Sequence, residues 1–329
     1  MKLSPATLGA VLILGLCASP LTVDAQQSRK VYRIGMLETR SATLNAANLD
    51  AFREGLRELG YRDGQNIEIV YRSSDGRNDR FPELARELVH LKVDVIVTRG
   101  TPAVQAAKSA TATIPVVMAA SGAPLESGIV ASLARPGGNV TGLSSGILES
   151  YPKQVQLLAE LIPRLRHLVA ILNMSNASLH PAWNNIEVSA RALAIQPQLL
   201  DVRRPEDLHA AFDAAAKARA EAVIVGLDTV TQTSLRSIAG LAAARRLPSI
   251  YPAKEYAELG GLMTYGSSDF HLYHRAAAFV DKIFKGARPA DLPVEQPTKF
   301  ELVINLKTAK ALGITIPQSV FLRANRVIE

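Results

Sequence analysis

Polar residues that could bind a ligand stand at the ends of several apolar runs in this sequence. In the stretch 93–118, a β-branched run typical of a buried parallel strand ends at Thr98, and Gly100 follows as a turn residue. Pro102 stands where a helix would begin, with Thr101 before it as a hydroxyl N-cap. Free N–H groups at such a helix start bind anions, and ligands bind at this edge of open α/β sheets. The stretch therefore predicts one wall of a binding site.

Other polar residues follow the remaining predicted strands, and together they predict a site for a small polar ligand. Thr101 with its helix start would bind a carboxylate, Asp228 an ammonium or hydroxyl group, and Tyr265 a ring or aliphatic face. The candidates in the first half of the chain are Glu38, Thr39, Gly100, Thr101, Ala120 and Ser121. Those in the second half are Asn173, Ser175, Asp228 and Thr229, with Tyr265 and Ser267 near a crossing between the halves.

A different chemistry is suggested by Gly142-Leu-Ser144-Ser-Gly146, which matches the nucleophile elbow of α/β-hydrolases. That motif requires a strand, a sharp turn and then a helix, with an acidic residue and a histidine later in the chain. Here Tyr151-Pro152 precedes the predicted helix, which favours a turn or hinge at Ser144. An exported serine hydrolase using Ser144 remains the alternative from another functional class.

Cofactor and metal sites have little support in the sequence. His271 and His274 are three residues apart, but a zinc site needs three or four ligands and no further ligand is obviously paired with them. The chain has no GxGxxG and no phosphate-loop pattern, which argues against a dinucleotide enzyme or an ATPase. We expect no cofactor, no metal and no enzymatic activity.

The first 25 residues have the features of a signal peptide. Lys2 gives a positive start, and residues 8–16 form an apolar run too short to span a membrane. Residues 23–25 end in the small-x-small pattern of a signal-peptidase site. We therefore expect cleavage near Ala25 and a periplasmic location.

The only cysteine, Cys17, lies inside this leader. Lipoprotein anchoring at Cys17 is the alternative to cleavage, but Leu16 stands where a lipobox has a small residue. Cleavage after Ala25 would leave no thiol, which excludes disulfides and cysteine nucleophiles.

Charge and size limit the class of protein further. The formal charge is +7, with 37 basic and 30 acidic residues and no basic run, which argues against a nucleic-acid partner. About 300 residues remain after the leader, more than one core usually holds, so we expect two lobes. We also expect the protein to be a monomer. No later segment is apolar enough over its length to cross a bilayer.

Apolar periodicity predicts two α/β series with parallel strands and right-handed crossovers, hence two doubly wound sheets. Turn residues around 122–142 interrupt the first series, and a second series follows. A helix over 270–284 and a late strand over 301–305 need places in one lobe or the other. We assign residues 26–142 and 263–296 to lobe 1, and residues 143–262 and 297–329 to lobe 2, which gives three crossings.

Five segments spread over nearly the whole mature chain match a family pattern. They are IPVVM (114–118), RPGGNVTG (135–142), VIVGLD (223–228), GGLMTYGSSDF (260–270) and LVINLKTAKALGITIP (302–317). In these segments the chain resembles the exported substrate-binding proteins of ABC importers, and most closely the group that includes tryptophan- and tyrosine-type binders. The resemblance implies the type I periplasmic-binding fold, with two Rossmann-like lobes, three crossovers and a ligand in the cleft. It also implies a membrane permease and a cytoplasmic ATPase as partners.

One departure from the family pattern affects the ligand. Members commonly carry Asp-Pro after the fourth strand, whereas this chain has Ala123-Pro124. An aromatic amino acid is therefore not transferred as the substrate, and a small carboxylated or aromatic solute is expected. A ligand-sensing module for a membrane receptor would share the fold and remains a second alternative.

Overall fold

The computed structural model describes residues 30–329, of which Val31–Glu329 form one compact unit. The predicted signal peptide and Cys17 lie outside the described residues. Within residues 30–329, no helix has the length and apolar character needed to cross a membrane.

The first sheet has five parallel strands in the order β2-β1-β3-β4-β5. Its strands are β1 (Tyr32–Glu38), β2 (Ile67–Ser73), β3 (Val95–Arg99), β4 (Val116–Ser121) and β5 (Val140–Ser144). The helices with it are α1 (Ala46–Glu58), α2 (Phe81–His90), α3 (Thr101–Ala110) and α10 (Asp269–Phe284), with the 3-10 turns η1 (Asn78–Arg80) and η2 (Pro289–Asp291). We call this sheet and its helices the first lobe.

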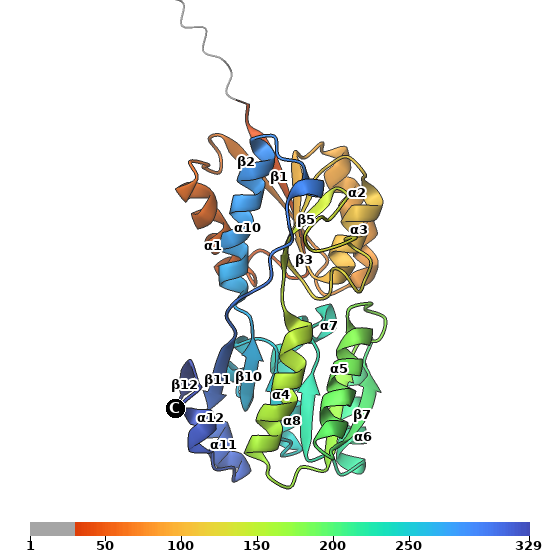
Figure 1. The fold of residues 1–329 in the computed structure, drawn as a ribbon, viewed down its shortest axis with the longest axis vertical. Coiled ribbons are helices and arrows are strands. Elements are labelled where there is room, and N and C mark those ends of the chain that lie inside the picture. The colour runs from red at the N-terminus through yellow and green to blue at the C-terminus, as the bar shows by residue number, and fades with distance from the viewer. Residues whose placement is uncertain (1–29) are drawn as a thin grey trace, which may run out of the picture. The chain divides into compact units, whose positions relative to one another are not determined.

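Helix α10 belongs to the first lobe although it comes late in the chain. It lies beside α1 (Figure 1), and Tyr273, Phe279 and Val280 share a buried core with Phe52 of α1 and with the first sheet. Gly55 permits this approach, because a Cβ there would stand 2.5 Å from the carbonyl oxygen of His274.

The second sheet has seven strands in the order β12-β11-β10-β9-β8-β6-β7, and only the β10–β11 pair is antiparallel. Its strands are β6 (His167–Leu172), β7 (Gln196–Asp201), β8 (Ala222–Val225), β9 (Ser249–Tyr251), β10 (Met263–Gly266), β11 (Glu301–Asn305) and β12 (Arg326–Ile328). Its helices are α4 (Ile147–Leu161), α5 (Leu179–Ala192), α6 (Asp207–Lys217), α7 (Thr229–Thr233), α8 (Leu235–Ala244), α9 (Glu255–Glu258), α11 (Leu306–Leu312) and α12 (Gln318–Phe321). This group is the second lobe.

The chain passes between the lobes three times, as the sequence predicts. The crossings connect β5 to α4, β10 to α10, and α10 to β11 (Figure 1). Strand β10 pairs with β9 and β11 in the second sheet. We therefore propose to place the second crossing after Gly266 rather than after Leu262.

Helix α4 begins earlier than expected, at Ile147, and contains Pro152 in its interior. Proline has no N–H to donate to the carbonyl four residues before it, which usually ends a helix. Here that carbonyl, on Leu148, accepts a hydrogen bond of 3.1 Å from the side chain of Asn185 on α5. The neighbouring helix thus supplies the missing donor, and the helix continues.

Candidate functional site

A small cavity, partly open to solvent, lies between the two sheets. Its walls are residues that follow strands of both sheets, which is the position where open α/β folds bind ligands. The lining consists of Thr39, Arg99, Gly100, Thr101, Pro102, Ala120, Gly122, Ser145, Asn176, Ser178, Leu227, Asp228, Thr229 and Gln232. Of the predicted residues, Thr39, Gly100, Thr101, Ala120, Asp228 and Thr229 are among them.

The first-lobe wall contains the start of α3. The N-cap residue is Gly100 rather than Thr101, since Thr101 is already the first helical residue. The φ of Gly100 is 84°, a value that glycine adopts without strain. No side chain caps α3, so the first N–H groups of this helix are not used by a side-chain cap. The Thr101 hydroxyl lies 3.4 Å from that of Ser121, and both residues are buried. This end of the cavity can donate hydrogen bonds to an anion.

The second-lobe wall is centred on Asp228, which is 2% exposed. Its Oδ1 accepts hydrogen bonds from Asn173 Nδ2 at 2.8 Å and from the Val230 N–H at 2.9 Å, so it caps α7. Its Oδ2 accepts a bond of 2.8 Å from Asn176 Nδ2. Within residues 30–329, no lysine, arginine or histidine forms an ion pair with it, so its charge can attract a ligand cation.

Two further predicted residues act behind Asp228 rather than in the cavity lining. The backbone N–H and the hydroxyl of Ser175 donate to Asn173 Oδ1 at 3.0 and 2.6 Å. Since its oxygen accepts from Ser175, the amide nitrogen of Asn173 faces Asp228. Asn173 and Ser175 therefore orient the carboxylate.

Arg99 connects the two lobes, although in the sequence it stands out only as part of a turn. It is the last residue of β3 and is 4% exposed. Its guanidinium donates to the side chain of Gln232 on α7 and forms an ion pair with Asp269 at the start of α10. These partners lie far from Arg99 in the sequence, so no local pattern predicts the contact.

Glu38 lies beneath the first-lobe wall and does not line the cavity. The hydroxyl of Tyr273, from α10, donates to both Glu38 carboxyl oxygens at 2.8 Å. Burial raises the pKa of Glu38 from 4.5 to about 7, although the Tyr273 hydrogen bond and the Arg99 charge act to lower it. Glu38 thus fixes α10 against β1, next to the cavity residue Thr39.

Of the remaining predicted contacts, Ser267 supports a residue that lines the cavity, and Tyr265 lies away from the cavity. The Ser267 hydroxyl donates to the carbonyl oxygen of Ser145 at 2.8 Å. Tyr265 stacks on Phe300 with ring centroids 5.6 Å apart, and it does not line the cavity. Ala123, which departs from the family pattern expected from the sequence, is 1% exposed within an apolar cluster.

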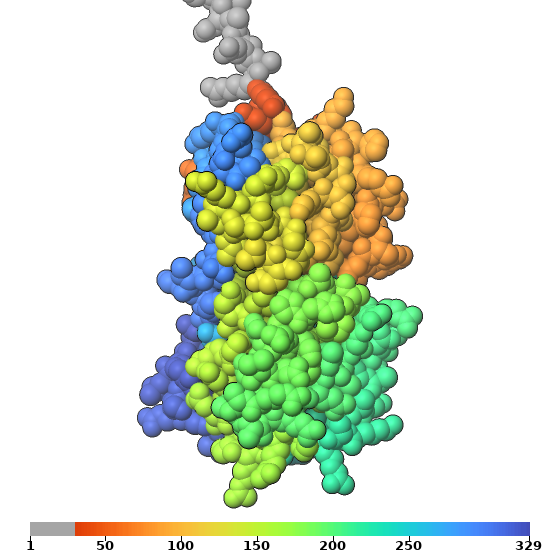
Figure 2. Space-filling model, turned by 45° about the vertical axis from the view of Figure 1, so that its right-hand side comes forward, coloured from red at the N-terminus to blue at the C-terminus, as the bar shows by residue number. Residues whose placement is uncertain are grey.

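The two lobes touch across the cavity. On the face shown in Figure 2, yellow atoms of the first lobe lie against green atoms of the second. A Cβ added to Gly122 would stand 2.9 Å from the Ser178 hydroxyl, which shows how closely the lobes approach. The described arrangement is therefore a closed one.

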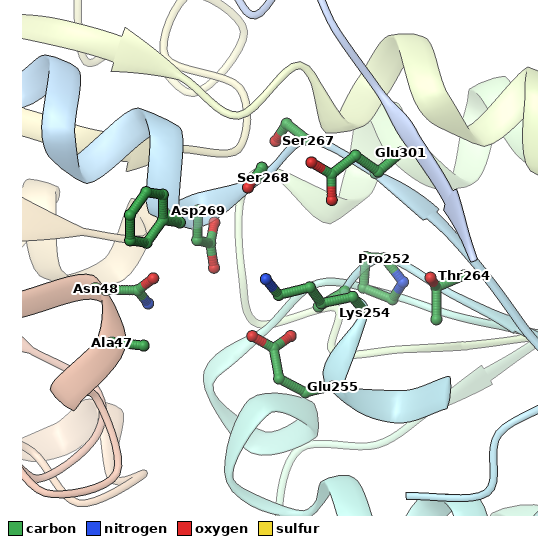
Figure 3. Close-up of a pocket in the computed structure, with 13 residues that line it drawn as sticks. Ala47, Asn48, Pro252, Lys254, Glu255, Thr264, Ser267, Ser268, Asp269 and Glu301 are labelled. Atoms are coloured by element: carbon green, nitrogen blue, oxygen red, sulfur yellow. The ribbon is translucent and has the colours of Figure 1, made fainter. Parts of the chain in front are cut away.

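A second small cavity lies between α1 and the second lobe. Lys254 and Glu255 reach toward it from one side, and Asn48 and Asp269 face it from the other (Figure 3). Because Asp269 pairs with Arg99, one ion pair connects the linings of the two cavities.

Sequence reasoning missed several cavity residues. They are Arg99, Pro102, Gly122, Ser145, Asn176, Ser178, Leu227 and Gln232. Most lie one to five residues beyond a predicted strand end, so extending each candidate stretch would have included them. Gln232 had no such signal, because α7 is a short helix that periodicity did not predict.

Ser144 has the strand, turn and helix that a nucleophile elbow requires, contrary to the expectation from Tyr151-Pro152. Its hydroxyl, however, accepts a hydrogen bond of 3.1 Å from the Gly146 N–H, and the residue is 4% exposed. Within residues 30–329 no histidine hydrogen-bonds to it. The Nε2 atom of His274 instead lies 3.2 Å from Oε2 of Glu58. Among the described residues, no group of three potential metal ligands occurs.

Comparison with known proteins identifies the family. The model for ABC transporter substrate-binding proteins matches residues 40–328. The chain belongs to this family. It has the type I periplasmic-binding fold of two mostly parallel sheets.

Two solved structures and one curated relative are similar to this substrate-binding protein over most of its length. A conserved domain protein from Vibrio cholerae has a TM-score of 0.85 at 28% identity, covering 91% of this chain and 100% of that one. An ABC domain from Streptococcus pneumoniae in complex with L-Trp has a TM-score of 0.84 at 28% identity, covering 90% and 99%. A tyrosine-binding protein from Clostridioides difficile is 28% identical over 300 residues, 87% of this chain and 82% of that protein.

Proposed function

We propose that this protein is the exported binding component of an ABC importer. It binds a small carboxylated or aromatic solute between its lobes and delivers it to a membrane permease driven by a cytoplasmic ATPase. It catalyses no reaction. The family supports a transport role, and relatives that bind tryptophan and tyrosine support a small-molecule ligand.

The observation that best supports the proposal is that a group able to bind an anion and a group able to bind a cation line the same cavity. The uncapped start of α3, with Thr101, faces the cavity from the first lobe. Asp228, a carboxylate without an ion-pair partner among the described residues, faces it from the second. An anionic and a cationic group on one solute, as in an amino acid, would satisfy both walls.

The predicted residues then have two roles in this proposal. Direct contacts come from Thr39, Gly100, Thr101, Asp228 and Thr229. Ser121, Asn173 and Ser267 act through neighbours that line the cavity. Ser175 acts through Asn173, and Glu38 acts through Tyr273 of α10. Tyr265 has no contact role, because its ring packs on Phe300.

Ligand binding would be coupled to closure of the lobes. Only a closed arrangement brings both walls to one solute, so the ligand favours that state by the contacts it adds. The Arg99–Gln232 contact between the lobes would form in the same step. The closed form then presents one continuous surface to the permease.

Thermal-shift and calorimetric screening of the mature protein tests the proposal. Amino acids, aromatic acids and small amides are the compounds to screen, together with mass spectrometry of any solute released from the purified protein. We expect at least one such compound to raise the Tm by several degrees. Absence of both stabilisation and a copurified solute would contradict the proposal.

A further inference from the structure

One hydroxyl in the lining of the cavity between the two sheets is buried without a hydrogen-bond partner. Ser145 is 3% exposed and lines the cavity, and its Oγ contacts no hydrogen-bonding group within residues 30–329. Its neighbour Ser144 differs, because that hydroxyl accepts a bond from the Gly146 N–H. Buried polar groups are almost always paired, so an unpaired one in a cavity wall needs an explanation.

The backbone of Ser145 is held from both lobes. Its N–H donates to the carbonyl oxygen of Ser121 in β4 at 2.8 Å. Its carbonyl oxygen accepts the hydroxyl of Ser267, just after β10, at 2.8 Å. The residue therefore sits at a fixed place in the crossing from β5 to α4, and a fixed donor binds a ligand at lower entropic cost.

Ser145 lies beside the first-lobe wall and lines the same cavity. Ser121 connects Ser145 to Thr101. The carbonyl oxygen of Ser121 accepts the Ser145 N–H, and its hydroxyl lies 3.4 Å from the Thr101 hydroxyl. These residues border the uncapped start of α3, the end of the cavity that can donate to an anion. A carboxylate bound there would accept the Ser145 hydroxyl as an additional donor.

The same cavity has no aromatic side chain among its lining residues. The nearby tyrosines are engaged elsewhere. Tyr256 stacks on Tyr251 and donates to the Thr231 carbonyl oxygen, and Tyr273 donates to Glu38. A ring bound in this cavity would have no aromatic face against which to pack, whereas hydrogen-bonding groups are abundant.

We propose that the Ser145 hydroxyl is a ligand contact, and that the cavity takes a small non-aromatic amino acid whose carboxylate this hydroxyl binds. The inference rests on the proposed function and specifies its ligand class. A non-aromatic ligand would distinguish this protein from the solved relative in complex with L-Trp, although the two chains are 28% identical.

The ligand class is tested by titrating the mature protein with two matched sets of amino acids. Glycine, alanine, serine and threonine form one set, and phenylalanine, tyrosine and tryptophan the other. We expect the tightest non-aromatic compound to bind at least tenfold more tightly than any aromatic one. Tighter or equal binding of an aromatic amino acid would overturn the inference and leave the proposed function intact.

A result without binding is also informative. If neither set binds and no solute is released from the purified protein, the proposed function fails together with the inference. If neither set binds but a solute copurifies, its chemistry decides: a non-aromatic amino acid supports the inference, and any other compound overturns it while leaving the proposed function.

The role of Ser145 is tested by Ser145→Ala beside the matched control Ser144→Ala. Ser145→Ala removes a hydroxyl that has no partner, so we expect the Tm of the ligand-free protein to stay within about 1 °C. Its Kd for the tightest non-aromatic amino acid should rise about tenfold. Ser144→Ala removes a hydrogen-bond acceptor, so we expect the reverse: a lower Tm and a Kd within about twofold of the parent.

The two readouts distinguish a ligand contact from a structural residue. If Ser145→Ala lowers the Tm and leaves the Kd unchanged, Ser145 supports the fold only and the inference is wrong. If Ser145→Ala and Ser144→Ala raise the Kd equally, the effect comes from the crossing segment as a whole, which also contradicts a specific contact.

Discussion

The two helices that begin at the cavity, α3 and α7, differ in how their first N–H groups are used. Helix α7 starts with a capping box, in which Asp228 accepts from the Val230 N–H and Thr231 accepts from the Asp228 N–H. Helix α3 starts at Gly100 with no side-chain cap. A carboxylate from the protein is built into one helix start, whereas the other is left for a group from outside.

This difference indicates that the walls are preformed to different degrees. On the second-lobe wall, Asn173, Asn176 and the Val230 N–H already hold Asp228 in one orientation. On the first-lobe wall, Thr101 has only a 3.4 Å contact with Ser121. Changes to the second wall should therefore affect folding and binding together, and changes to the first mainly binding.

The largest effect is expected from Asp228→Asn. The amide nitrogen of the new side chain would face the Nδ2 donor of Asn173 or Asn176. The negative charge of Asp228, which faces the ligand ammonium, would also be lost. We expect about 2 kcal/mol lower stability and a Kd at least about 100-fold higher for the amino acid that binds best. Urea unfolding and calorimetry measure the two quantities.

The control for Asp228 is Asp201→Asn, at another strand end, whose carboxylate accepts the Met174 N–H at 2.9 Å outside the cavity. It should lower stability modestly and leave the Kd unchanged. An unchanged Kd for Asp228→Asn would show that the second wall has a structural role only.

Glu38→Gln is expected to change how stability depends on pH. Burial raises the pKa of Glu38 from 4.5 to about 7, so between these values the unfolded chain releases a proton that the folded chain keeps. The stabilisation that comes from the raised pKa of Glu38 is fully present below pH 4.5 and is lost as the pH rises to about 7. At pH 7.5 we expect Glu38→Gln to be more stable than the parent by up to about 3 kcal/mol.

Urea unfolding at pH 4.5 and 7.5 measures this prediction. The difference between Glu38→Gln and the parent should be small at the lower pH and large at the higher one. Glu126→Gln, at an exposed position, is the control and should show no such difference. Equal differences at both pH values would contradict the assignment to Glu38.

Gly122→Ala tests the contact between the two walls. The added Cβ would stand 2.9 Å from the Ser178 hydroxyl and 3.0 Å from its Cβ, so closure would require a shift. We expect about tenfold weaker binding in calorimetry and little change in Tm, because the clash arises where the lobes meet. Gly240→Ala, where a Cβ would meet nothing within 4 Å, is the control. Equal Kd values in both variants would mean that closure does not bring Gly122 to Ser178.

Thr101→Val should have the smallest effect. It keeps the shape of the side chain and removes a hydroxyl whose contact with Ser121 is long. We expect about a fivefold higher Kd by calorimetry with a nearly unchanged Tm. The control is Thr113→Val, at an exposed position outside the cavity, where the hydroxyl has an equally long contact of 3.4 Å with that of Thr111. A large loss of stability in Thr101→Val would show that the first wall is as structural as the second.

The sequence by itself determined the two α/β series and which polar residues follow their strands. Apolar periodicity and turn residues act locally, so strands such as Ser249–Tyr251 and Glu301–Asn305 and the helix Leu235–Ala244 were predicted with their observed ends. Side chains after parallel strands share one edge of a sheet, which is why the sequence points to Thr39, Thr101 and Asp228 together, and the structure places all three in the lining of one cavity. Short elements such as α7 and α9 escaped prediction, since they contain too few residues to show a period.

Only the tertiary structure decided how those residues are used. Arg99 meets Gln232 and Asp269 because three crossings bring distant segments together, and no local pattern encodes that encounter. Whether Tyr265 faces a ligand or packs on Phe300 depends likewise on the last crossing, which places Phe300 and Glu301 beside β10. Local sequence determines which groups stand at strand ends, while long-range packing determines which of them remain free to bind.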